Sequence, residues 1–254
     1  MYNDLFSIGS ITVHSYGAFI AIGIIAAYVV MMKRTKKRNI NIDTIDNLFF
    51  FVLLSGFLGS RILYCITEIN QVMKDPSIIF NLSDGYVVYG GIIGGVLGGY
   101  VYCKRKKMPF LQILDLAIPS LALAQGFGRI GCFMAGCCYG METTSGIGVV
   151  FPVDSLAPSG TALIPTQLIS SVFDFVLFFV LIMYDKRKKE DGQVAALYLI
   201  LYSVGRFIIE LFRGDLIRGN VGALSTSQFI SVFIFLIGIG FFITLTKKKM
   251  KKDN

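Results

Sequence analysis

The chain contains few charged residues for its length. Only 16% of its 254 residues are Asp, Glu, Lys or Arg, whereas a soluble domain carries about 25%. Hydrophobic residues make up 54%, and the mean hydropathy is +0.68. This composition excludes an ordinary water-soluble globular protein and favours a protein embedded in a membrane.

Other features that the sequence lacks narrow the possible classes of membrane protein further. The chain has a single histidine, His14, and its cysteine spacing fits no zinc pattern, so neither a metal nor a cofactor is expected. No internal repeat is visible, which argues against a transporter built from duplicated halves. The opening residues, MYNDLFSIGS, lack the basic stretch of a cleaved signal peptide, so none is expected.

Hydrophobic segments of membrane-spanning length recur along the chain. A helix needs about 20 residues to cross roughly 30 Å of hydrocarbon. The segments lack the two-residue alternation of barrel strands, which leaves helices as the structure able to satisfy the backbone in lipid. We predict an all-α integral membrane protein with a single membrane domain, residues 1–254. It would be a bundle of seven transmembrane helices, at residues 13–32, 45–66, 86–103, 111–134, 166–184, 193–212 and 226–246.

Basic residues predict the orientation. Lysine and arginine cluster in KRTKKR (33–38), KRKK (104–107), DKRKK (185–189) and KKKMKK (247–252), each after an alternate hydrophobic segment. By the positive-inside rule these loops are cytoplasmic, which puts the N-terminus outside and the C-terminus in the cytoplasm. The net charge of +8 is therefore attributed to topology and lipid contact, with no nucleic-acid partner.

The longest segment between helices, residues 135–165, would lie outside the membrane in this topology. Gly, Ser, Thr and Pro dominate it, and Pro152, Pro158 and Pro165 prevent a long helix. We expect an extracytoplasmic loop or cap that covers substrate.

A second group of cations lies at the outer ends of the predicted helices or in the outer loops. It comprises Arg61, Arg129, Arg206 and Arg213, together with Lys74 and Arg218. An arginine inside a transmembrane segment usually faces the bundle interior or a wet cavity. Because the planar guanidinium matches phosphate oxygens, this group predicts an anion site. The alternative is that each arginine snorkels or pairs with an acid.

Residues 193–212 carry a polar stripe. Tyr202, Arg206, Glu210 and Arg213 follow one another at helical intervals and would share one face. Glu210 can pair with Arg206 or with Arg213, and one of these pairs is expected.

Glycine is concentrated in YGGIIGGVLGG, residues 89–99. Close packing between membrane helices is one explanation. A backbone-lined phosphate site at Gly90 and Gly91 is the other.

Several motifs, in order along the chain, resemble those of the prolipoprotein diacylglyceryl transferase family. They are FSIGSITVHSYGAFIAIG, GSRILY, DGYVVYGGIIGG, DLAIPSLALAQGFGRIG, PTQL and LYSVGRFIIELFRGD. The resemblance implies transfer of the diacylglyceryl group of phosphatidylglycerol to the lipobox cysteine thiol in a prolipoprotein signal peptide, with release of glycerol phosphate. It also implies a multi-pass protein of the bacterial plasma membrane, in contact with membrane lipids.

The resemblance also implies roles for individual residues. Arg129 and Arg206 would hold the phosphate, while Tyr16 and Tyr202 would orient it. Supporting positions would be Arg61, Glu210 and Arg213.

The chain departs from the family pattern at several positions. Tyr89 stands where the family has a histidine, so it becomes the candidate base, which a phenol of pKa about 10 fills only if strongly activated. Cys132 replaces an asparagine, and Cys137 ends the segment that replaces Asn-Gly-Glu. The glutamate that usually follows PTQL is missing.

Cys132, Cys137 and Cys138 form a thiol cluster with several open interpretations. They could form a structural or redox disulfide, line the substrate site, or act as a nucleophile; metal binding has the least support. Three alternatives for the function stay open: a paralogous transferase with another acceptor, a membrane thiol oxidoreductase and a non-catalytic lipid transporter.

Overall fold

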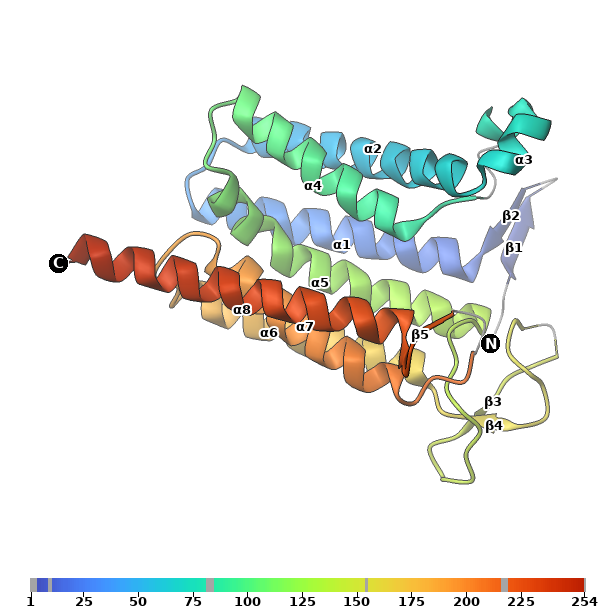
Figure 1. Cartoon of the computed structure of the whole chain (residues 1–254). Helices are drawn as coiled ribbons and strands as arrows, with labels where there is room; N and C mark the ends of the chain where they lie inside the picture. The colour runs from blue at the N-terminus through green and yellow to red at the C-terminus, as the bar shows by residue number, and fades with distance from the viewer. Residues whose placement is uncertain (1–3, 9–10, 81–84, 154, 216–218, 254) are drawn as a thin grey trace. The chain divides into compact units, whose positions relative to one another are not determined.

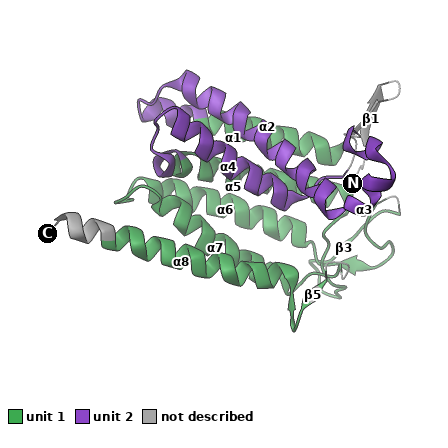
Figure 2. Cartoon of the chain, turned by 45° about the horizontal axis from the view of Figure 1, so that its top comes forward, with its two compact units in different colours: residues 1–31, 114–254 green, residues 32–113 purple. Residues whose placement is uncertain are grey.

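The computed structural model of the chain is largely helical and divides into two compact units. It describes residues 4–8, 11–80, 85–153, 155–215 and 219–253. The first unit combines residues 1–31 with 114–254, and the second comprises residues 32–113 (Figure 2). In sequence, the second unit is thus an insertion into the first.

Six helices in the described ranges are long and apolar enough to cross a membrane (Figure 1). They are α1 (Ser15–Lys37), α2 (Ile42–Thr67), α5 (Phe110–Ala135), α6 (Thr166–Asp185), α7 (Gln193–Glu210) and α8 (Thr226–Asp253). The prediction of a helical, multi-pass membrane protein is confirmed.

The segment expected as a further crossing, residues 86–103, is the helix α4 (Val88–Arg105). It is not among the six, because its glycines and the terminal Lys104 and Arg105 dilute its apolar residues. The count of seven crossings therefore stays a prediction.

The first helix begins later than predicted. Residues 11–14 form strand β2 (Ile11–His14), which pairs antiparallel with β1 (Asp4–Ile8), so α1 starts at Ser15 instead of residue 13. The three β-branched residues at 11–13 favour a strand over a helix, which explains the difference.

Helices α5, α6 and α7 supply the core of the first unit, and α8 packs against α7. Helix α7 packs along both α6 and α8, and Ser171 of α6 donates to the Gly126 carbonyl of α5 at 2.8 Å. The buried core side chains are Ala122 of α5, Leu177 and Leu181 of α6, and Val194 and Tyr198 of α7. This packing sets the relative positions of the polar residues that these helices carry.

A buried carboxylate fixes the start of α7. Asp115, on α5, is fully buried and accepts from Lys188 Nζ at 2.7 Å and from the backbone N–H groups of Gly192 and Ala195 at 2.8 and 3.0 Å. Because the first N–H groups of a helix lack intrahelical acceptors, Asp115 acts as a cap supplied by another helix.

Residues 136–165, between α5 and α6, fold into a small cap. Strand β3 (Val149–Val150) pairs antiparallel with β4 (Ala162–Leu163), around a core of Phe151, Ala157 and Leu163. The backbone of Gly140 forms a bridge with Arg213, so the cap is joined to the chain that leaves α7. A short hairpin of β5 (Asn220–Val221) and β6 (Leu224–Ser225) precedes α8.

In the second unit, α2 and α4 pack closely through glycine. A Cβ on Gly90 would lie 2.3 Å from the Gly59 carbonyl oxygen, and one on Gly94 would lie 2.4 Å from that of Ser55. Only residues without a side chain allow such an approach. The unit also contains the short helices α3 (Ile69–Lys74) and η1 (Pro76–Phe80).

Candidate functional site

Three arginines gather in the first unit. Arg129 lies on α5, Arg206 on α7, and Arg213 in the loop after α7. Arg206 is within electrostatic range of both Arg129 and Arg213. The predicted grouping of these guanidinium groups is therefore present, although their partners differ.

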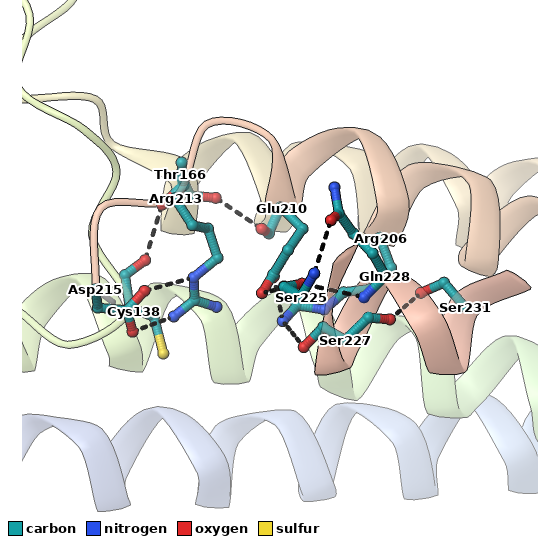
Figure 3. A network of polar contacts seen from close by, with 11 residues as sticks. Cys138, Thr166, Arg206, Glu210, Arg213, Asp215, Ser225, Ser227, Gln228 and Ser231 are labelled. Atoms are coloured by element: carbon teal, nitrogen blue, oxygen red, sulfur yellow. Dashed lines mark hydrogen bonds and ion pairs between the residues drawn. The ribbon is translucent and has the colours of Figure 1, made fainter. Parts of the chain in front are cut away.

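Arg206 is held by an acid and a hydroxyl but keeps one donor group free. Its Nη2 lies 2.7 Å from Glu210 Oε2 and donates to Ser227 Oγ at 3.1 Å (Figure 3). Ser225 Oγ in turn donates to Glu210 Oε1 at 3.2 Å. The other terminal nitrogen, Nη1, is buried without a hydrogen-bond partner in the described chain. A buried donor of this kind is costly unless a ligand satisfies it.

Arg213 is paired with a neighbouring acid. Its Nε and Nη2 donate to the two carboxylate oxygens of Asp215 at 2.8 and 2.5 Å (Figure 3). Burial opposes the charge, but these hydrogen bonds raise the pKa of Arg213 above its ordinary value. The prediction that Arg213 continues the polar stripe of the helix is thus wrong, because α7 ends at Glu210. Glu210 pairs with Arg206, and Arg213 braces the loop that follows.

Arg129 contrasts with the other two. Within the described chain its guanidinium forms no hydrogen bond and no ion pair. Its electrostatic neighbours are Tyr202, Cys132, Asp174 and Cys138. A cation that lacks a protein partner inside a helical bundle is a ready ligand for an anion.

Asp174 was missed by the sequence interpretation. It lies on α6, is 2% exposed, and is within electrostatic range of Arg129 and Arg206. A carboxylate inside a hydrophobic segment is itself a functional signal, and that signal was available at SSVFDFVLF.

Two tyrosines predicted to orient the anion border this cluster. Tyr202 stacks on Tyr198 with ring centroids 5.3 Å apart and lies in electrostatic range of Arg129. Tyr16, at the start of α1, is 43% exposed and is close to Arg129 and the thiol cluster. Both therefore belong to the same neighbourhood as the open guanidinium.

The thiol cluster is assembled by a turn at the end of α5. The sulfur atoms of Cys132, Cys137 and Cys138 lie within 4.8 Å of one another, and none of the three forms a disulfide. Hydrogen bonding with the Cys132 and Cys138 thiols, and then burial, raise the pKa of the Cys137 thiol. The linear spacing fits no zinc pattern, but the fold nevertheless brings three potential metal ligands together.

The remaining predicted residues belong to the second unit. Arg61 donates to the carbonyls of Gly85 (2.8 Å) and Ile78 and lies over the rings of Tyr64 and Tyr86. These contacts hold the loop that leads from α2 to α4.

Tyr89 is 47% exposed in the first turn of α4, beside the glycine pair. Gly90 and Gly91 both face α2, which favours the close-packing interpretation. Lys74 ends α3, and Arg218 lies outside the described residues.

The fold and the arginine cluster define a class: a multi-pass membrane protein that carries a cluster of arginines among its helices. Comparison with known proteins identifies the family. The chain belongs to the prolipoprotein diacylglyceryl transferase family, whose model matches residues 3–244. It is therefore a transferase.

Several relatives match over almost their whole length. Phosphatidylglycerol–prolipoprotein diacylglyceryl transferase of Clostridium tetani is 50% identical over 92% of this chain and 94% of that protein. The second such enzyme of Clostridium perfringens is 50% identical over 95% of this chain and 94% of that protein. The enzyme of Finegoldia magna is 36% identical over 98% and 97%.

Proposed function

We propose that this protein transfers the diacylglyceryl group of phosphatidylglycerol to the lipobox cysteine of prolipoproteins in the plasma membrane of a bacterium. The observation that carries the proposal is that Arg129, which forms no hydrogen bond or ion pair within the described chain, lies in electrostatic range of Arg206, whose Nη1 is buried without a hydrogen-bond partner. Together they offer unsatisfied donors to a phosphate. The names of the relatives supply the donor lipid and the acceptor protein.

The reaction increases the negative charge on the phosphate that these donors would bind. The acceptor sulfur attacks the glyceryl carbon that carries the phosphate, a carbon–sulfur bond forms, and the carbon–oxygen bond breaks. The acceptor proton goes to solvent. The phosphate, a diester with one negative charge, departs as glycerol phosphate with a charge of about −2. Donors that gain strength as this charge develops lower the barrier.

Each polar residue then has a task. Arg129 and Arg206 bind the phosphate, Tyr202 and Tyr16 orient it, and Glu210 holds Arg206 in place. Arg213, bound to Asp215, braces the loop that joins the cap. Asp174 lies within electrostatic range of both Arg129 and Arg206.

The topology follows from the basic loops. Seven crossings, with α4 as the seventh, would place the N-terminus outside and the C-terminus in the cytoplasm. The arginine site would then lie toward the outer face of a single membrane domain, with the predicted extracytoplasmic loop, residues 135–165, over it. Lipid headgroup and prolipoprotein would meet there.

The test is transfer from radiolabelled phosphatidylglycerol to a synthetic lipobox peptide by purified protein in detergent. Wild type is expected to label the peptide cysteine and to release glycerol phosphate. Arg129→Ala and Arg206→Ala are each expected to lower transfer by about 10²- to 10³-fold, the usual loss on removing one donor to a developing anion. Arg129→Lys should also be poor, because an ammonium loses the planar fork.

Arg187→Ala is the matched control, because it removes an exposed arginine of a basic loop. It should leave transfer unchanged. Near-wild-type transfer by both Arg129→Ala and Arg206→Ala would remove the phosphate site from the proposal.

A further inference from the structure

The thiol cluster has the geometry of a partly formed metal site. Zinc–sulfur bonds of about 2.3 Å place the sulfurs of a tetrahedral site about 3.8 Å apart. The sulfurs of Cys132, Cys137 and Cys138 already lie within 4.8 Å of one another. Side-chain movements of about 1 Å or less would therefore complete three bonds to one ion.

The backbone is shaped to bring these sulfurs together. After α5 ends, Gly136 and Cys138 take positive φ angles of 74° and 64°. A non-glycine residue is uncommon in this conformation and persists only where the surroundings enforce it. The Cys137 N–H also donates to the Cys132 carbonyl at 3.1 Å, which folds the turn back onto the helix.

Buried side chains at the start of α6 hold the turn. Thr166 Oγ1 donates to the Cys138 carbonyl at 2.8 Å, and Gln167 Nε2 donates to the Cys137 carbonyl at 2.7 Å. Thr166 and Gln167 are 2% and 1% exposed. Ligands that are fixed in this way before the ion binds favour a metal site.

The surrounding charge also suits such a site. A divalent ion bound by three thiolates carries a net negative charge. Arg129 lies in electrostatic range of Cys132 and Cys138, and Arg213 interacts with Cys138. These guanidinium groups would offset the charge of the complex.

We propose that Cys132, Cys137 and Cys138 bind Zn²⁺ or a similar thiophilic divalent ion, with its fourth position open to the acceptor thiol. Three protein ligands and one open position are the pattern of a catalytic zinc site. Binding of the ion displaces three thiol protons to solvent. The part of the proposal that concerns the acceptor rests on the proposed function.

The open position would activate the acceptor. A thiol that coordinates a divalent ion loses its proton to solvent and is held as a thiolate. Its sulfur then attacks the glyceryl carbon, and the neutral thioether that results leaves the ion. Cys132 follows Arg129 by three residues on α5, so the bound acceptor and the phosphate would sit one helical turn apart. The ion would thereby take over the task of the family histidine that Tyr89 replaces.

Metal binding is tested independently of transfer. Purified full-length protein in detergent is titrated with Co²⁺, and Zn²⁺ content is measured after dialysis. Wild type is expected to bind about one equivalent with the charge-transfer absorption of cobalt thiolate. Cys137→Ser should weaken this signal, and the triple Cys→Ser variant should lose it. Cys65→Ser, a cysteine of α2 outside the cluster, is the matched control and should behave as wild type.

Transfer to the lipobox peptide is then compared with and without chelator at pH 7.5. A free thiol of pKa about 8.5 is roughly one-tenth ionised there, so chelation should lower wild-type transfer about tenfold or more. Cys65→Ser should respond in the same way. If the Cys137→Ser variant elutes as a folded protein, its rate of transfer should be low and should not change when chelator is added.

The outcomes separate the two proposals. Absence of the cobalt signal in wild type, or a disulfide among the three cysteines found by mass spectrometry, would overturn the metal site. Transfer that is normal in the triple variant or under chelator would overturn the acceptor role while leaving the proposed function intact. A cobalt signal with no transfer under any condition would support the metal site and refute the proposed function.

Discussion

Replacing Gly90 by alanine tests whether this glycine packs α4 against α2 or lines a phosphate site. An alanine Cβ would lie 2.3 Å from the Gly59 carbonyl oxygen and 2.6 Å from Leu63 Cβ. Gly95, on the same helix, is the matched control, since its Cβ would meet only Val52 Cγ1 at 3.7 Å, an ordinary contact. The two variants make the same chemical change in different surroundings.

The two substitutions are expected to change the free energy of unfolding in opposite directions. Alanine favours a helix over glycine by about 1 kcal/mol, which should leave Gly95→Ala as stable as wild type or slightly more so. At Gly90 the obstacle is backbone that no rotamer change can move. The helices must separate by about 1 Å to restore contact distance, and overpacking of this kind costs about 1–3 kcal/mol. Gly90→Ala should therefore be destabilised by up to about 2 kcal/mol net.

The assay is unfolding in mixed micelles, followed by far-ultraviolet circular dichroism, with transfer measured under conditions where all variants are folded. We expect a lower unfolding midpoint for Gly90→Ala and a normal one for Gly95→Ala. If Gly90→Ala is as stable as Gly95→Ala but has lost transfer, the packing argument is refuted and a phosphate contact at Gly90 is supported.

Two further predictions concern single side chains. Asp115→Ala removes the buried partner of Lys188 and the cap of α7, so its free energy of unfolding should fall by about 3–5 kcal/mol. Asp191→Ala removes the exposed partner of the same lysine and should cost about 0–1 kcal/mol in that unfolding assay; equal costs would contradict the capping role. Tyr89→Phe should lose less than tenfold in transfer if a metal activates the acceptor, whereas a loss of about 10² or more would make its phenol the base.

The helices and the basic loops could be predicted from the sequence, because the hydropathy and the charge of a segment depend only on the residues within it. The start of α1 was misplaced, since strand pairing at Ile11–His14 depends on residues outside the hydrophobic segment. The end of α7 was misplaced for a similar reason: the chain leaves the helix after Glu210 to join the cap.

The candidate site was only partly predictable. The family motifs identified Arg129 and Arg206, but the sequence could not say which arginine Glu210 would bind. Helical spacing allowed both, and only the end of α7 and the position of Asp215 decided between them. Asp174 was visible as an acid in an apolar segment, yet its proximity to two arginines required three helices to be placed together.

By itself, the sequence determined that this chain is a helical, multi-pass membrane protein and which family it belongs to, because these properties reside in local composition and motifs. The tertiary structure decided which cations are neutralised and which remain open, and it brought Cys132, Cys137 and Cys138 into one cluster. Such properties depend on distances between residues far apart in the chain or across a turn. Only packing of the folded helices fixes those distances.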